Sequence, residues 1–152
     1  MAEPHPESAP QHSTPLGNQL RADLNRARSA LIEAELARHP SERFLAAHMA
    51  ALRIAAVVLA LRATRTSRNS GRPRNAWRVL AEVAPEYGEW AAFFAATEGK
   101  RDAVRAGATA IVTGREADDL VRDAQIFLGL VERRLDHHRG LDHHRDSRAG
   151  RP

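Results

Sequence analysis

Arg43 and His48 are the residues whose types and spacing best suit chemistry, because they have four residues between them at the start of an apolar segment. Histidine exchanges protons near neutral pH, and an arginine guanidinium can stabilise negative charge that develops on a phosphate. The pair is therefore the candidate catalytic site. The alternative interpretation of His48 is a core histidine that is hydrogen-bonded to a backbone carbonyl or a carboxylate. Five residues along a helix correspond to about 140° of rotation, so the two side chains diverge unless Arg43 lies in a frayed first turn.

A second group of candidates consists of arginines within and beside residues 64–74, a segment that also contains glycine, proline and serine. Flexible arginine-rich segments bind nucleic-acid phosphates, although many such runs are solvated loops. The candidate nucleic-acid-binding residues are Arg62, Arg65, Arg68, Arg72, Arg74 and Arg78. Trp77 and Trp90 could stack on bases, but their helical spacing favours packing in the core.

Paired histidines near the C-terminus could bind a transition metal through imidazole. They belong to a direct repeat, LDHHRG at 135–140 followed by LDHHRD at 141–146, in a tail that predicts no fixed geometry for a metal. We interpret metal binding at His137, His138, His143 and His144 as adventitious, and we predict no physiological metal site and no cofactor. The chain contains no cysteine, which excludes thiol catalysis and cysteine-based zinc sites.

The elements that position these residues are predicted to be helices, because apolar residues recur at spacings of three and four. Thr14 and Pro15 suit the start of a first helix, which ends before Pro40. A second helix, over about residues 42–63 with Ser41 as its cap, is apolar on nearly every side and is predicted to be central. Arg53 interrupts it and is expected to pair with Asp119 or Asp123 of the last helix.

The remaining helices have recognisable start and stop signals. Asn75 suits the cap of a third helix, Pro85 restarts or kinks it, and Gly99 is expected to end it. A short helix over residues 100–106 is expected to end at Gly107.

The last helix begins at a capping box, in which Thr113 and Glu116 cap each other's backbone groups. One regular apolar face is expected to join the core, made of Ala117, Leu120, Val121, Ala124, Phe127, Leu128, Val131 and Leu135. Ile126 and Leu130 lie off that face and form a smaller apolar ridge, which is the candidate interface.

Together these signals predict an all-α bundle of four to five helices over residues 14–135, with disordered tails at 1–13 and 136–152. The chain has 152 residues and a net charge of +4, which suits one domain. It has no uninterrupted apolar run of about 18 residues and no recognisable signal peptide, so we expect a cytoplasmic protein without membrane contact.

Three blocks of the chain, in their order, resemble a small single-domain HEPN family of actinobacteria. They are ERFLAAHMAALR at 42–53, NAW at 75–77 with APE at 84–86, and READDLVRDA at 115–124. The resemblance covers about residues 16–135. It implies a bundle of four main helices that often dimerises.

For catalytic HEPN families the resemblance also implies a metal-independent ribonuclease, with a composite site from two subunits. Their motif is an arginine, four to six residues, and a histidine near the start of the last core helix. Arg115 stands near that start, but Leu120, Val121 and Arg122 occupy the places of the histidine. Arg43 and His48 have the spacing of this motif, but they lie in the second helix. In a chain this rich in arginine, several arginine–histidine pairs with that spacing are expected by chance.

Three functions therefore remain open from the sequence. The preferred one is a non-catalytic HEPN-like module that dimerises and binds RNA or a protein partner through residues 62–78. The second is a divergent metal-independent HEPN ribonuclease that uses Arg43 and His48, with Arg115 as a further candidate. The third is a purely structural adaptor with Ile126 and Leu130 at the protein contact.

Overall fold

The computed structural model describes residues 14–63 and 75–149, with side chains up to residue 138, and this part of the chain contains helices and turns without strands. Six α-helices and two short 3₁₀ turns follow one another: α1 (Pro15–Leu36), α2 (Pro40–Ala63), α3 (Ala76–Val83), η1 (Pro85–Tyr87), α4 (Gly88–Ala96), α5 (Glu98–Arg105), η2 (Thr109–Ile111) and α6 (Gly114–Ala149). The predicted all-α bundle is confirmed. The expected disordered N-terminus and the basic segment 64–74 lie outside the described residues.

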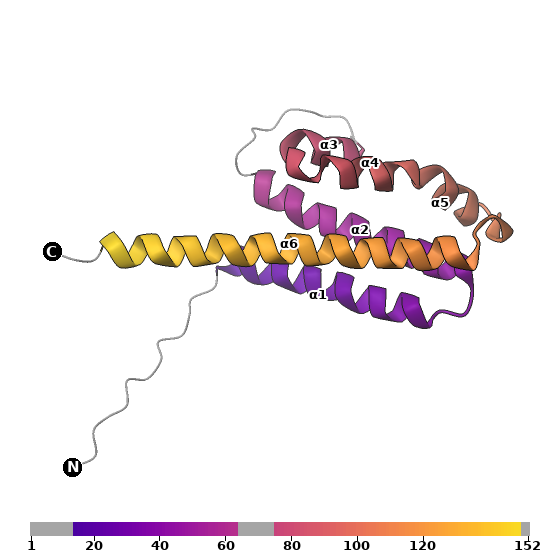
Figure 1. The fold of residues 1–152 in the computed structure, drawn as a ribbon, viewed down its shortest axis with the longest axis horizontal. Helices are drawn as coiled ribbons and strands as arrows, with labels where there is room; N and C mark the ends of the chain where they lie inside the picture. Colours follow the sequence, from indigo (N-terminus) through magenta and orange to yellow (C-terminus); the bar gives the residue numbers. More distant parts are fainter. Residues whose placement is uncertain (1–13, 64–74, 150–152) are drawn as a thin grey trace, which may run out of the picture.

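Helix α2 is the centre of the bundle. It packs against α1 and α6 on one side and against the layer of α3, α4 and α5 on the other (Figure 1). Its segment Pro40–Arg62 is long and apolar enough to cross a membrane by length and composition alone. In this fold neighbouring helices bury about half of that apolar window, as expected for the core helix of a bundle, and Met49 stays 44% exposed.

Two kinds of side chain fill the core around α2. Four of its completely buried positions are alanine, which lets neighbouring helices approach closely: Ala47, Ala50, Ala51 and Ala55. Towards α3, α4 and α6 the core is instead aromatic. Trp77 stacks on Phe94 with ring centroids 5.0 Å apart, and Trp90 stacks on Phe127 at 5.7 Å. The predicted core packing is confirmed for Trp77, which is fully buried, and Trp90 is half-buried and packs against the core.

Several predicted helix ends are confirmed by their hydrogen bonds. The Asn75 side chain accepts from the backbone N–H of Trp77 at 2.9 Å and so caps α3. At the start of α6 the Thr113 hydroxyl accepts from the Glu116 N–H at 3.1 Å, while the Glu116 carboxylate accepts from the Thr113 N–H at 2.9 Å. Gly107 has a φ of 109°, a conformation that suits glycine, and it follows the end of α5.

Two predicted boundaries are wrong for local reasons. Helix α2 begins at Pro40, because proline suits the first turn, and the His39 carbonyl accepts from Glu42 and Arg43, so Ser41 is not the cap. Gly99 lies inside α5 and does not end α4. The break comes at Thr97 instead, whose hydroxyl donates to the Phe94 carbonyl at 2.7 Å.

The predicted pairing of Arg53 across the bundle is also wrong. Its side chain is exposed and lies near Glu33 of α1, because a long arginine side chain can reach solvent from a mostly buried helix. Asp119 and Asp123 instead pair with arginines of their own helix, chiefly with Arg122.

Helix α6 is longer than predicted. The tail expected to be disordered from residue 136 continues the helix to Ala149, and α6 extends beyond the bundle in Figure 1. Gly140 is the only glycine or proline between residues 136 and 149, and a single glycine costs a helix only about 1 kcal/mol. Residues 150–152 lie outside the described residues.

Candidate functional site

His48 is completely buried in α2, with none of its surface exposed. Its ring meets the edge of Trp77, with centroids 6.0 Å apart and planes at 83°. Neither ring nitrogen makes a hydrogen bond within the described part of the chain. The prediction of a core histidine is therefore right about burial, and the backbone carbonyl that acts on the ring is that of Phe94, although it lies outside normal hydrogen-bond geometry.

The surroundings of His48 favour its neutral form. Burial lowers the pKa of the imidazole, and the positive charge of Arg101 lowers it further, while the Phe94 carbonyl, Glu98 and Asp102 oppose this shift. The Phe94 carbonyl is already engaged, because it accepts from both the hydroxyl and the N–H of Thr97. A neutral imidazole in this environment resists protonation at the pH values where an exposed histidine would titrate.

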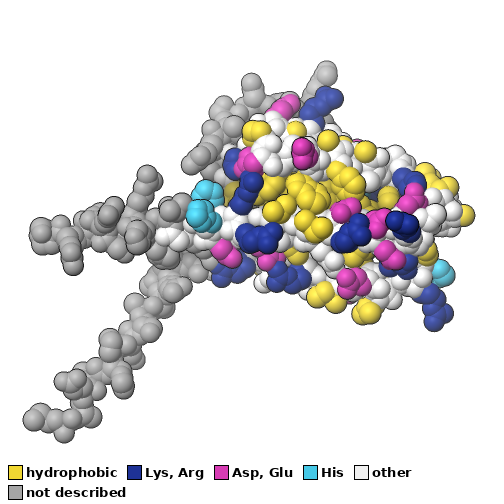
Figure 2. All heavy atoms as spheres, viewed as in Figure 1, with side chains coloured by type: hydrophobic (Ala, Val, Ile, Leu, Met, Phe, Trp, Pro, Cys, Tyr) yellow, Lys and Arg dark blue, Asp and Glu magenta, His cyan; other side chains and the backbone are white. Residues whose placement is uncertain are grey.

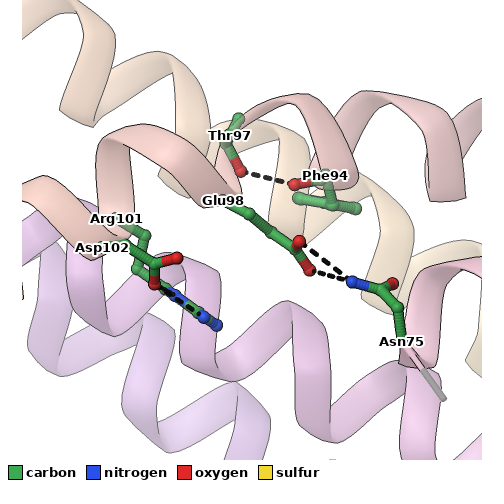
Figure 3. A network of polar contacts seen from close by, with 6 residues as sticks. All are labelled: Asn75, Phe94, Thr97, Glu98, Arg101 and Asp102. Atoms are coloured by element: carbon green, nitrogen blue, oxygen red, sulfur yellow. Dashed lines mark hydrogen bonds and ion pairs between the residues drawn. The ribbon is translucent and has the colours of Figure 1, made fainter.

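A polar cluster on α3 and α5 supplies these charges, and sequence reasoning missed it. The Asn75 amide donates to both carboxylate oxygens of Glu98, at 2.9 and 3.0 Å, and Arg101 pairs with Asp102 at 3.0 Å (Figure 3). Asn75 thus caps α3 with its oxygen and ties α3 to α5 with its nitrogen. Its cap signal was visible in the sequence, but no sequence signal connected it with Glu98, 23 residues away.

Arg43 is a connector between three helices. Its Nη1 donates to the Ala37 carbonyl at 3.0 Å, just past the end of α1, and its Nε lies 3.0 Å from the Asp118 carboxylate of α6. The side chain is only 14% exposed. The structure therefore gives Arg43 protein partners on both sides, which satisfy the unpaired carbonyl at the α1 end and hold the first turns of α2 and α6 together.

The predicted arginine group divides in two. Arg62 donates to the Val83 carbonyl at 3.2 Å and pairs with Glu86, so it joins α2 to the α3–η1 turn. Arg134 reaches the same carboxylate at 3.5 Å and lies 4.7 Å from the centre of the Tyr87 ring. Arg78 is exposed near the start of α3. The four arginines Arg65, Arg68, Arg72 and Arg74 lie outside the described residues.

Ile126 and Leu130 lie on the outer side of α6. Ile126 is 45% exposed and Leu130 is half-buried. Phe93 of α4 is also exposed, and Trp90 beside it is half-buried. We call Trp90, Phe93, Ile126 and Leu130 the α4–α6 patch. In Figure 2 hydrophobic side chains gather above α6, next to the α4–α5 layer, with arginine and acidic side chains around them.

Within the described residues no group of three or more histidine and acidic side chains is placed to hold a metal ion. The side chains of His143 and His144 lie outside that part of the chain, whereas His137 and His138 are exposed on α6.

The bundle is all-α, with a central apolar helix and a capped last helix. The model of the SAV_6107-like HEPN family matches residues 34–132, which run from the end of α1 into α6 and include well over half of the chain. The chain therefore belongs to the HEPN proteins, as a member of the SAV_6107-like family. No curated protein and no solved structure matches it.

Proposed function

We propose that this protein is a non-catalytic HEPN module that dimerises and acts by binding a macromolecule, with RNA as the candidate ligand. The observation that carries the first part is the complete burial of His48. A general base must come within hydrogen-bonding reach of the hydroxyl that it deprotonates. An imidazole beneath Trp77 and the α3–α5 layer has no such access without opening the bundle.

The partners of Arg43 support the same proposal. A phosphate-stabilising arginine must turn its guanidinium towards the substrate. Arg43 uses its guanidinium on the Ala37 carbonyl and on Asp118 instead, and it is largely shielded from solvent. Both members of the candidate catalytic pair thus have a structural role that explains them.

The proposal of RNA as ligand rests on charge. Arg78 presents an exposed guanidinium at the start of α3, and four further arginines precede it in the chain at positions 65–74. A run of this kind binds phosphates without reading sequence, with an affinity that falls steeply with salt. We leave Arg62 out of this proposal, because its guanidinium donates to the Val83 carbonyl and pairs with Glu86.

Two measurements test the proposal on the full chain. The first is incubation of the protein with a mixed RNA substrate in EDTA, beside the His48→Gln variant, with folding checked by circular dichroism. We expect no cleavage by either protein. Cleavage by the wild type that the folded His48→Gln variant lacks would overturn the proposal in favour of a metal-independent ribonuclease.

The second measurement is fluorescence anisotropy with a labelled single-stranded RNA at low and physiological salt. Changing Arg65, Arg68, Arg72 and Arg74 to serine should weaken binding by at least about tenfold at low salt. A matched control changes exposed arginines elsewhere to serine, namely Arg26, Arg38, Arg105 and Arg115. Equal effects of the two sets would refute a specific role for residues 65–78 and favour a protein partner.

A further inference from the structure

A second periodic stripe runs along the outer side of α6, separate from the face that joins the core. Its members follow one another at spacings of four and three, the spacing that the contact positions of paired helices have, with an apolar pair at its centre and charged or polar residues on either side. The α6 stripe consists of Asp119, Asp123, Ile126, Leu130, Arg133 and His137. All six side chains are at least partly exposed in the structure.

The charges of the α6 stripe are ordered along the helix. Two acids precede the apolar pair Ile126 and Leu130, and Arg133 and His137 follow it. A second helix that ran parallel in register would place like charges opposite one another. An antiparallel copy of the same stripe would place each acid opposite a basic residue, so the stripe is complementary to itself in one orientation only.

We propose that the α6 stripe pairs with the α6 stripe of a second copy of this chain, antiparallel, with Ile126 opposite Leu130. This inference rests on the dimerisation in the proposed function. It adds the surface through which two copies pair and the register of the two helices. The same register sets Asp123 opposite Arg133 of the second copy. It also sets Asp119 opposite His137 of the second copy, and each layer occurs twice about the two-fold axis.

The Asp123 carboxylate has no close cationic partner within the described part of a single chain. Its side chain is only 24% exposed, and the nearest cationic atom, on Arg122, is 4.0 Å away. Burial raises the pKa of its carboxyl, and Asp119 adds to this effect, against the pull of Arg122. An arginine supplied by a second copy would compensate this carboxylate better than the single chain does.

The rest of the α4–α6 patch would extend the contact. Phe93 is 40% exposed and packs on the edge of Trp90, which in turn stacks on Phe127 of α6. Buried aromatic side chains commonly dominate the affinity of protein interfaces. Arg134 does not compete with the stripe, because it is turned towards Glu86 and Tyr87. The acids at one end of the stripe make RNA a poor occupant of this surface.

Sedimentation velocity on the full chain tests the register directly. The wild type is expected to be a dimer. Asp123→Arg and Arg133→Asp each create two like-charged layers in a homodimer, and each should raise the dimer Kd by at least about 100-fold. The double variant Asp123→Arg/Arg133→Asp restores both layers with their charges exchanged and should dimerise again.

Mixing the two single variants gives a stronger test. In a mixed dimer every layer is again complementary, so equimolar Asp123→Arg and Arg133→Asp chains should form a heterodimer although neither dimerises alone. The matched control is Asp136→Arg, a charge reversal on α6 outside the stripe, which should leave the dimer intact. Circular dichroism of each single variant excludes unfolding as the cause.

The outcomes separate this inference from the proposed function. If the wild type is a monomer at about 100 µM, its self-association is weaker than that of a stable dimer. This result would overturn both the stripe and the dimerising part of the proposed function. A wild-type dimer that is indifferent to the single charge reversals would overturn the stripe alone. A single reversal that disrupts the dimer without rescue in the double variant or in the mixture would also overturn the antiparallel register.

Discussion

Replacing His48 by leucine should remove an acid-sensitive component of stability. Both ring nitrogens are buried without a hydrogen bond of normal geometry in the described residues, and burial lowers the pKa of the imidazole despite the opposing effect of the Phe94 carbonyl. The unfolded chain, with an ordinary histidine pKa near 6.5, therefore binds more protons than the folded chain below that pH. The free energy of unfolding is fully retained above about pH 6.5 and declines as the pH falls below it.

The size of the effect follows from the same linkage. If His48 stays neutral in the folded chain down to pH 5.5, its contribution falls by about 1.4 kcal/mol between pH 7.5 and pH 5.5. Leucine has a similar volume and no polar atoms, so His48→Leu should be neutral or up to about 2 kcal/mol more stable at pH 7.5. His48→Ala leaves a cavity and should be about 2–4 kcal/mol less stable at every pH.

Urea denaturation of wild type and both variants at pH 7.5, 6.5 and 5.5 measures these differences. The other titrating groups are common to all three proteins, so they cancel in the comparison of wild type with His48→Leu. A wild-type pH dependence that His48→Leu retains in full would refute the reasoning. A loss of several kcal/mol in His48→Leu at pH 7.5 would show that the imidazole makes a favourable interaction that burial and distances do not reveal.

Three further changes test how the helices are tied together, each by urea denaturation at pH 7.5. Arg43→Ala removes hydrogen bonds to the α1 end and the ion pair with Asp118, and should cost about 2 kcal/mol; no loss would refute the connecting role. Thr113→Ala removes one half of the capping box and should cost about 1 kcal/mol, whereas an unchanged midpoint would mean that the cap is not formed in solution. Gly107→Ala places a side chain at a φ of 109° and should cost about 1 kcal/mol, while the control Gly99→Ala, inside α5, should stabilise slightly; equal effects would contradict the positive φ.

Local signals in the sequence predicted most of the helices and several of their ends. The buried stripe of α1 and the capping box of α6 depend on residues three or four apart, so they can be read from a short window. The misplaced boundaries reflect competition between equally local signals. Pro40 and Ser41 both suit a helix start, and nothing in their own residues shows which is used.

The candidate site was less predictable, because its character comes from contacts between distant elements. His48 was a candidate for both core and catalysis, and only the packing of Trp77 and Phe94 over α2 shows that it is buried. The partners of Arg43 include Asp118, which is 75 residues away and one of several acids on α6 that sequence reasoning could not tell apart. Long-range pairing of this kind is fixed by the docking of whole helices.

The core has two regions that should tolerate substitution to different degrees, namely the four buried alanines of α2 and the aromatic side chains packed beside them. Alanine has no rotamers with which to absorb an extra methyl group, so each enlargement there must displace a neighbouring helix. The aromatic region near Trp77, Phe94 and Phe127 has larger side chains that can exchange volume among themselves. Mutational drift in this fold should therefore accumulate among the aromatic side chains, while the buried alanines of α2 fix the distances from α2 to its neighbouring helices.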